Sequence, residues 1–246
     1  MIYHAPKLLN RLPGITAGIT YAKRDIYNTT ESINGLNLGE NTGSSMQVVK
    51  RNLEILDQEI NDNGNIALAD QIHGADVSVI SDSGYYTGID GFITTENRLL
   101  IGIKVADCVA ILLADSTTHA LAAVHAGWRG AASGILPNTL DKMKKEGSDL
   151  SELVCYISPC ISVRNFEVGE EVAEKFPSQF INRSIGEKPH LDLKGFLASQ
   201  LRDAGVQNSN IEIDPRCTVD NSSFYSYRRE RDKAGRMLAF ITQTLN

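Results

Sequence analysis

Long apolar runs are missing from this sequence of 246 residues. The longest unbroken aliphatic run, Val109–Ala114, is far shorter than the ~20 residues that a membrane-spanning helix needs. Residues 1–14 contain no extended apolar stretch after a basic start, which a signal peptide would have. We therefore expect a cytoplasmic protein without a membrane partner.

An excess of positive charge is also missing. The chain carries 24 Lys and Arg residues against 30 Asp and Glu residues, a formal net charge of -6. This balance argues against nucleic acid or an anionic membrane as the main partner, although it allows a local basic patch. With 42% apolar and 22% charged residues, the chain can form a sizeable core, so disorder of the whole chain is excluded.

Cysteine is scarce and C-x-x-C pairs are absent. Without an export signal, we expect free thiols rather than a disulfide framework. Low-complexity segments, internal repeats and linkers rich in Pro or Ser are absent too, which predicts one domain over residues 1–246. The four cysteines, a number that would also suit a structural zinc site, are Cys108, Cys155, Cys160 and Cys217.

Short runs rich in Ile and Val are what the sequence does contain, and they predict strands. From Ser45 to about Asn63-Gly64, apolar residues recur at steps of three and four, which predicts a helix. Because strands come in runs with helices between the runs, we expect an α+β layered fold. The other expected elements are strands at 15–20, in five runs within 66–114, and at 119–125, 153–157, 211–213 and 236–242, with helices at about 130–145, 169–176 and 192–204.

Three side chains with catalytic or metal-binding potential lie at strand boundaries. His73 follows an apolar strand, Cys108 separates two apolar strands, and His125 ends a strand before a glycine-rich turn. Layered α/β folds position reactive side chains at such strand ends. Two imidazoles and one thiolate form a three-ligand set for zinc, and the same ligands suit copper.

The same residues allow two other interpretations. Cys108 activated by His125 would be the nucleophile of a hydrolase. Alternatively, Cys108 is a small buried residue and the histidines are polar caps, which are the more common roles of such residues. The pattern alone leaves all three interpretations open.

Arginines near the glycine-rich turns are candidates for anion binding. Arg129 lies in the turn HAGWRG, beside the single Trp of the chain. Arg228 and Arg229 belong to the C-terminal segment SYRRERD, whose Arg side chains can bind phosphate or carboxylate bidentately. A solvated mixed-charge surface is the alternative for this segment.

Several short motifs occur in a characteristic order along the chain. They are LNLG (36–39), QIH (71–73), DG (90–91), ADC (106–108), HAGWRG (125–130), FEVG (166–169) and SYRR (226–229). In this combination the chain resembles the laccase-domain family, first called multicopper polyphenol oxidases and now described as zinc-dependent purine nucleoside phosphorylases. The resemblance extends from about residue 36 to Arg236.

The resemblance implies a fold, a metal site and an activity. The fold would be a single-domain layered α/β/β/α arrangement, a central β-sandwich flanked by helices. Zinc, with copper as the other possible ion, would be held by His73, Cys108 and His125. The implied reactions are the cleavage of adenosine, inosine, guanosine or methylthioadenosine with phosphate, and the deamination of adenosine. The implied catalytic residues are Cys108, His125 and Arg129, and the implied substrate-binding residues are Asn37, Asn52, Gln71, Phe166, Arg228 and Arg229.

Four positions depart from the family's usual pattern. Ala110 stands where Pro is usual, Leu53 follows Asn52 in place of Arg, Ser158 replaces Gly, and Phe166 replaces Tyr. Because none of these changes removes a metal ligand, we expect them to affect substrate range and rate rather than the metal site. Loss of the Tyr hydroxyl at position 166 keeps a ring that can stack on a base.

Three competing functions follow from the same residues. One is copper-dependent oxidation of phenols, although few His and Cys residues remain for further copper centres. The second is a hydrolase with a Cys108–His125 pair that cleaves an amide, such as that of a cell-wall precursor. The third is a binding protein without catalysis.

Overall fold

A computed structural model describes residues 1–27, 33–40, 42–60 and 65–245, and it consists of stacked sheets covered by helices. Two six-stranded sheets pack face to face, and a two-stranded sheet lies apart from them. The first sheet has the order β1 (Tyr3–His4), β2 (Ile15–Thr20), β14 (Met237–Gln243), β7 (Leu100–Val105), β3 (Ile66–Asp70), β5 (Gly84–Thr87). The second has the order β13 (Ile211–Ile213), β10 (Val154–Ile157), β8 (Val109–Ala114), β9 (Leu121–Ala126), β6 (Gly91–Thr94), β4 (Val77–Val79), and the third pairs β11 (Ile181–Asn182) with β12 (His190–Leu191).

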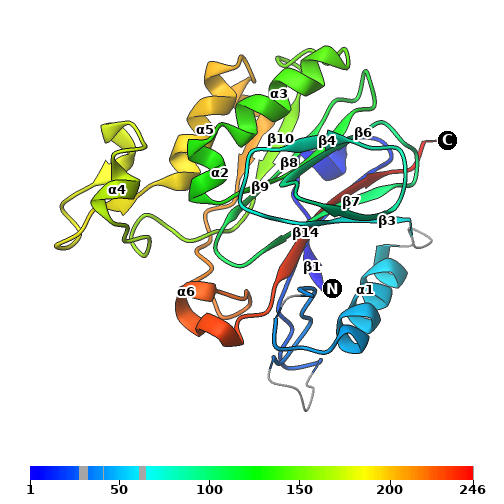
Figure 1. Ribbon diagram of the computed structural model, residues 1–246. Helices are drawn as coiled ribbons and strands as arrows, with labels where there is room; N and C mark the ends of the chain where they lie inside the picture. The colour runs from blue at the N-terminus through cyan, green and yellow to red at the C-terminus, as the bar shows by residue number, and fades with distance from the viewer. Residues whose placement is uncertain (28–32, 41, 61–64, 246) are drawn as a thin grey trace.

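Helices cover the outer faces of both large sheets (Figure 1). On one side α2, α3 and α5 pack against the second sheet, and on the other side α1 packs against the first. The predicted α/β/β/α layering is therefore confirmed. The helices are α1 (Met46–Ile60), α2 (Trp128–Ala132), α3 (Ile135–Lys145), α4 (Glu170–Ala173), α5 (Leu193–Asp203) and α6 (Tyr227–Glu230).

Strand β8 shows why the central strands are apolar without interruption. Val109 and Ile111 face the core under the helices, whereas Ala110 and Leu112 face the core between the two sheets. Successive side chains of a strand point to opposite faces, and here both faces are buried. A continuous apolar run is therefore the pattern that this position in the layers demands.

The helix predicted over 130–145 is two helices. Gly134 separates α2 from α3 with a φ of 85°, a left-handed conformation that breaks the helical path. Pro137 lies in the first turn of α3, where its missing N–H removes no intrahelical hydrogen bond. Helix α2 begins at Trp128, just after β9 ends at Ala126, and so Arg129 lies beside the end of this strand.

Elements that the sequence did not indicate are short or exposed. Strand β5 is mostly exposed, and its residues Gly84–Thr87 have no apolar alternation. Helix α6 is a single turn whose start is capped by Ser226, which accepts a hydrogen bond from the Arg229 backbone N–H. The predicted start of α1 at Ser45 is confirmed, whereas its predicted end at Asn63-Gly64 lies outside the described residues.

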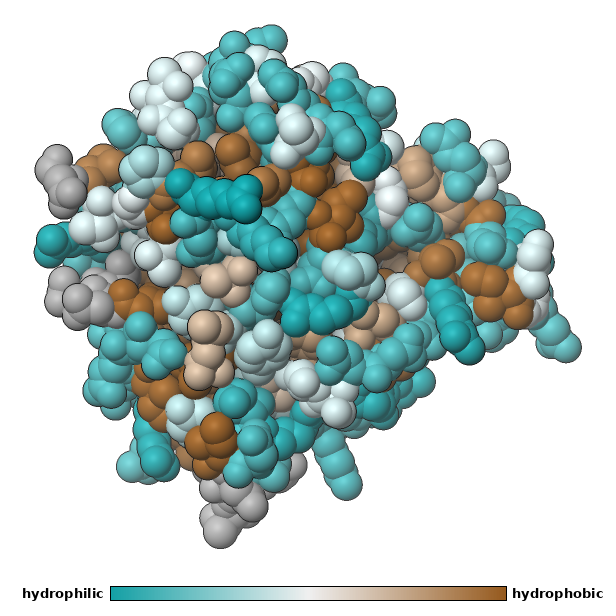
Figure 2. Space-filling view, turned by 180° about the vertical axis from the view of Figure 1, so that it is seen from behind, coloured by the Kyte–Doolittle hydropathy of each residue, from teal (hydrophilic) through white to brown (hydrophobic). Residues whose placement is uncertain are grey.

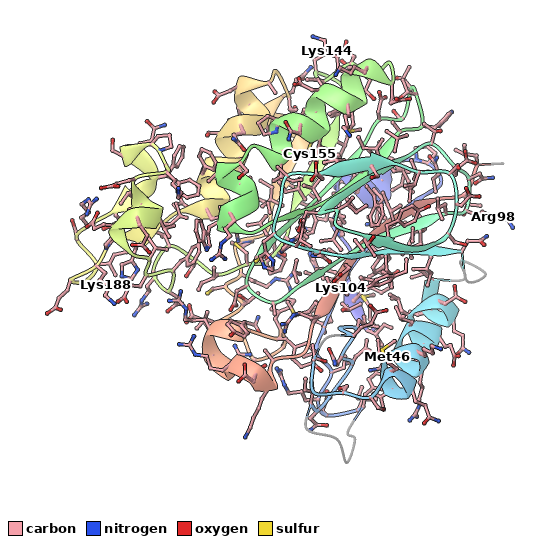
Figure 3. The ribbon with its side chains drawn as sticks, in the orientation of Figure 1. Met46, Arg98, Lys104, Lys144, Cys155 and Lys188 are labelled. Atoms are coloured by element: carbon pink, nitrogen blue, oxygen red, sulfur yellow. The ribbon has the colours of Figure 1, made fainter. Side chains whose placement is uncertain are left out.

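A segment that contains α4, β11 and β12 projects from the layered body (Figure 1). Lys188, labelled in Figure 3, lies at the far end of this projection, whereas Lys104 lies near the centre of the molecule. The rear face in Figure 2 carries interspersed apolar and polar side chains. Among the described residues, the helices are too short or too polar to cross a membrane, and all four cysteines are free thiols.

Candidate metal centre

His73 lies in the turn after β3, in a backbone conformation that few residues other than glycine adopt. Its φ is 60°, and its backbone N–H donates to Oδ1 of Asp90 at 2.9 Å. The N–H of Gly74 donates to the other carboxylate oxygen at 2.6 Å. Because the buried Asp90 accepts from both residues, it holds the turn in a shape that it would not adopt alone.

Cys108 lies in the connection between β7 and β8, directly after Asp107, whose φ is 90°. The Asp107 carboxylate is fully engaged within the protein. One oxygen accepts from the Thr218 hydroxyl and the other from the Arg228 backbone N–H, both at 2.6 Å. These contacts tie the Cys108 turn to the C-terminal segment.

His125 is buried near the end of β9, and Asp90 also binds its ring. Nδ1 of His125 lies 2.6 Å from Oδ1 of Asp90. A carboxylate on one ring nitrogen fixes the tautomer and leaves the other nitrogen, Nε2, available to a metal. Asp90 thus orients both histidines, one through its backbone and the other through its ring.

The side chains of His73, Cys108 and His125 meet at one end of the β-sandwich. Their potential ligand atoms lie within 4.8 Å of one another, close enough to surround one ion after a small adjustment. Gly127 faces all three, and an added Cβ would lie 3.1 Å from Cys108 Sγ, 3.1 Å from His73 Cδ2 and 3.9 Å from His125 Cε1.

The donor set fits a catalytic metal site. Two imidazoles and a thiolate are borderline-soft ligands, and three protein ligands leave a coordination position open. Among residues 1–27, 33–40, 42–60 and 65–245, this is the only such cluster of three or more His, Cys, Asp or Glu side chains. This group could hold one ion, whereas a multicopper oxidase needs several copper centres.

Cys108 and His125 each shift the pKa of the other. Burial raises the pKa of the Cys108 thiol, but the imidazoles of His125 and His73 outweigh it and lower the pKa to about 6. Burial lowers the pKa of His125, but Cys108 and Asp90 outweigh it and raise the pKa to about 9. Near neutral pH the site therefore favours a thiolate beside an imidazolium, and a metal that binds there displaces a proton from His125.

The lowered pKa predicts an unusually reactive thiol. In metal-free protein, alkylation of Cys108 by iodoacetamide should be fast above pH 7 and should slow as the pH falls through about 6, where the thiolate becomes protonated. An ordinary cysteine would show its midpoint near pH ~8.5. The rate at each pH can be followed by mass spectrometry, with the Cys108→Ala variant giving the background from other thiols. A midpoint above pH 8 would contradict the expected ion pair.

Replacing Asp90 with Asn is expected to weaken the metal site without removing a ligand. The Asn side chain cannot accept hydrogen bonds on both of its polar atoms, so the His73 turn and the His125 ring lose their shared support. Loss of such an orienting group typically costs about 10- to 100-fold in metal affinity or activity. Competition with a chelator of known affinity would measure the change, and unchanged affinity would contradict it.

The candidate ligands open into a cavity of about 550 Å3, hereafter the site cavity. This volume is in the range of pockets that bind small molecules. Arg129 stacks on the ring of Trp128, with its guanidinium carbon 4.4 Å from the ring centroid. The predicted site residues that line the cavity are His73, Cys108, His125, Arg129, Gln71, Phe166 and Arg228.

Two of these lining residues also have structural hydrogen bonds. Gln71 donates to the Lys104 carbonyl and accepts from the Lys104 N–H, both at 2.8 Å, so its amide joins the ends of β3 and β7. Arg228 donates to the carbonyls of Asn165 and Glu167, each at 3.1 Å, and lies over the Phe166 ring. Arg228 therefore positions the wall that carries this aromatic side chain.

Three predicted substrate-binding residues lie outside the site cavity. Asn37 is fully buried, and its amide binds within the loop that follows it. Asn52 of α1 is buried and donates to the Asn37 carbonyl at 2.8 Å. The Arg229 guanidinium binds the Glu230 carboxylate and the carbonyls of Thr218, Val219 and Phe224.

Three further residues of this region, Asp90, Lys104 and Arg236, are not predicted as site residues by the sequence. Asp90 was visible only as part of the DG motif, and nothing in the sequence indicated that it holds both histidines. Lys104 and Arg236 line the site cavity from β7 and from the residue before β14. Lys104 interrupts the apolar segment LIGIKV, and Arg236 directly precedes the apolar segment MLAFI. A charge next to or within a buried strand is the signal that could have identified them.

Residues 19–244 match a family model described as multi-copper polyphenol oxidoreductase laccase. The chain belongs to this laccase family. A purine nucleoside phosphorylase of Mycobacterium tuberculosis is 35% identical over 202 residues, which is 79% of each chain. Another purine nucleoside phosphorylase, from Streptomyces coelicolor, is 32% identical over 215 residues, covering 84% of this chain and 87% of its own.

A solved structure of similar sequence shares the fold. YlmD from Geobacillus stearothermophilus superimposes with a TM-score of 0.88 at 28% identity, covering 95% of this chain and 93% of its own. The chain therefore shares its α/β/β/α architecture with this solved structure over nearly its whole length.

Proposed function

We propose that this laccase-family protein is a zinc-dependent purine nucleoside phosphorylase. The observation that carries the proposal is the His73–Cys108–His125 cluster at a cavity lined by arginines and aromatic rings. The names of the Mycobacterium and Streptomyces relatives support the substrate class. Copper, which the same ligands accept, is the alternative ion.

The side chains around the cavity suit both parts of the reaction. Phe166, Trp128 and Tyr227 offer flat apolar surfaces on which a purine ring can stack, and Arg129 adds a positive charge. In phosphorolysis the bond between the sugar C1′ and the base nitrogen breaks, a phosphate oxygen bonds to C1′, and the base leaves with a proton. A metal held by the three ligands would supply Lewis-acid polarisation of a substrate atom.

The proposal predicts phosphate-dependent release of free base. Protein with one zinc per chain is incubated with adenosine, inosine, guanosine or methylthioadenosine, with and without phosphate, and the bases are separated by chromatography. The expected result is release of the substrate's own base (adenine, hypoxanthine or guanine) together with the 1-phosphate of its sugar, only when phosphate is present. No base release from any of the four, in protein with full metal content, would contradict the proposal.

Adenosine deaminase activity is the second part of the proposal. It requires water in place of phosphate, and therefore predicts ammonia and inosine from adenosine in phosphate-free buffer. An assay for ammonia separates this reaction from phosphorolysis, because phosphorolysis releases none.

A specific arrangement favours one other candidate, a cysteine hydrolase that acts on an amide. Cys108, His125 and Asp90 are placed as a nucleophile, a base and an orienting carboxylate. Activity that persists in metal-free protein and is lost on thiol alkylation would favour this candidate. Activity that is lost with the metal and returns with added zinc would favour the phosphorylase.

A further inference from the structure

The arginines of the site cavity differ from its lysine in their ion pairing: Lys104 pairs with the Glu40 carboxylate at 3.2 Å. Among the described residues, no ion pair joins a carboxylate to any of the three cavity arginines, which are Arg129, Arg228 and Arg236. Outside the cavity, Arg229 pairs with Glu230 and Arg216 with Asp214. The carboxylates of Glu40, Asp70 and Asp107 line the same cavity. Within the described residues the three guanidinium groups nevertheless have no ion-pair partner, which favours an anionic ligand.

Arg236 differs from the other two cavity arginines in how its guanidinium is held. Arg129 is exposed, and both terminal nitrogens of Arg228 donate to backbone carbonyls. Arg236 is partly buried, and its guanidinium carbon lies 6.0 Å from the Tyr227 ring centroid. Within the described residues its guanidinium donates through Nη1 alone, to the carbonyls of Ala234 and Gly235 at 2.7 and 3.1 Å. The Nη1 end of the guanidinium is thus fixed, and its other N–H groups can bind a ligand.

The backbone and stem of Arg236 are held by the loop that contains Asn37. Oδ1 of Asn37 accepts from the Arg236 N–H at 2.8 Å and from the Gly39 N–H at 3.0 Å. Gly39 lies against the stem so closely that an added Cβ would be 2.5 Å from Arg236 Cγ. Asn52 donates to the Asn37 carbonyl, so contacts run from α1 through this loop to the cavity.

Partial burial of Arg236 disfavours the charged form of its guanidinium. Burial lowers the pKa of its guanidinium, although Cys108 and Asp107 oppose this shift. Arginine nevertheless stays protonated in proteins, so a partly desolvated cation is present before substrate arrives. An oxyanion that enters the cavity would satisfy this cation through charge-assisted hydrogen bonds.

We propose that Arg236 binds the attacking inorganic phosphate and that Asn37, supported by Asn52, positions it. The role of phosphate as co-substrate rests on the proposed function, whereas oxyanion binding at Arg236 does not. The same chemistry would also accept the phosphoryl group of a nucleotide. Asn37 and Asn52 act from outside the cavity because they place the residue that lines it.

Steady-state kinetics test the first half of the proposal. Arg236→Gln should raise the KM for phosphate by about 10- to 100-fold, the effect of losing charged hydrogen bonds, with the nucleoside KM within about twofold. Arg236→Lys should be intermediate because it keeps the charge and loses the fork. Arg183→Gln is the matched control, since Arg183 forms an exposed pair with Glu170 on the projecting segment, and it should behave as wild type.

Asn37→Ala tests the positioning role. It should raise the phosphate KM in the same direction as Arg236→Gln while the nucleoside KM stays within about twofold, because the Asn37 side chain affects the cavity through the loop that holds Arg236. Loss of these buried hydrogen bonds should also lower the melting temperature. A purely structural role would raise the KM of both substrates alike. An unchanged phosphate KM in Asn37→Ala would overturn the positioning role.

Direct binding separates this inference from the proposed function. Wild-type, Arg236→Gln and Arg236→Lys holoproteins, matched in metal content and melting temperature, are titrated with inorganic phosphate by calorimetry. Phosphate binding that depends on Arg236 supports the inference even if no nucleoside is cleaved. Equal phosphate affinity in all three proteins overturns it even if phosphorolysis is observed. A parallel titration with a nucleoside monophosphate identifies a nucleotide as the source if only that compound binds, and this result also overturns the assignment to free phosphate.

Discussion

Cys108→Ala is expected to abolish metal binding and to reduce phosphorolysis by about 1000-fold or more. Two histidines alone cannot complete the three-ligand set, and a Lewis acid supplies several kcal/mol of transition-state stabilisation. Metal content per chain, measured by atomic emission, should fall from one to near zero. The rate of base release should fall in parallel, because the Lewis acid is lost with the metal.

Cys217→Ala is the matched control for this variant. Cys217 is also a partly buried free thiol, but its sulfur accepts hydrogen bonds from Ser162 and Asn165 outside the metal cluster. It should keep one metal per chain and near wild-type activity. Full metal occupancy in Cys108→Ala would refute the proposed ligand set, whereas full activity in a metal-free variant would refute the metal-dependent mechanism.

Gly127→Ala is expected to weaken metal binding and lower the reaction rate although all three ligands remain present. Its Cβ would lie 3.1 Å from both Cys108 Sγ and His73 Cδ2, closer than ordinary packing allows. The ligands would be pushed apart at the point where they must converge on one ion. A misplacement of about 1 Å at a catalytic centre can cost about 100-fold in rate, and weaker metal binding should add to this loss.

Gly186→Ala provides the comparison for the glycine substitution. A Cβ at position 186, on the projecting segment, would approach His190 Nε2 no closer than 3.5 Å, which is ordinary contact. This variant should match the wild type in metal content and rate. Chelator competition and initial rates measured on both variants would reveal the difference. If Gly127→Ala bound the metal as tightly as the wild type, the space between the three ligands would tolerate a methyl group, contrary to this prediction.

Much of the layered fold could be predicted because its strands are buried on both faces. Runs such as Val109–Ala114 are long enough and apolar enough to be recognised without alignment to other sequences. Strand β5 escaped prediction because exposed residues on an edge strand need no apolar alternation. Helix α6 escaped because one turn is too short to show a helical period.

The candidate site residues divide in a similar way. His73, Cys108 and His125 could be singled out because rare, chemically active side chains fall at strand ends, and the family resemblance grouped them. The structural roles of Asn37 and Arg229 could not be predicted from the sequence. Both belong to motifs that suggested substrate binding, yet their side chains bind other groups of the protein. Adjacent arginines at 228 and 229 point to different environments because they lie on one turn of helix.

By itself, the sequence determined the apolar layers, the free thiols and the three candidate ligands, since each is set by local composition and by strand period. Only the tertiary structure decided which polar groups serve the site. Asp90 reaches His73 and His125 across 17 and 35 residues, and Asn37 reaches Arg236 across 199. Such contacts depend on where β3, β6, β9 and β14 lie in the two sheets, and no local pattern carries that information.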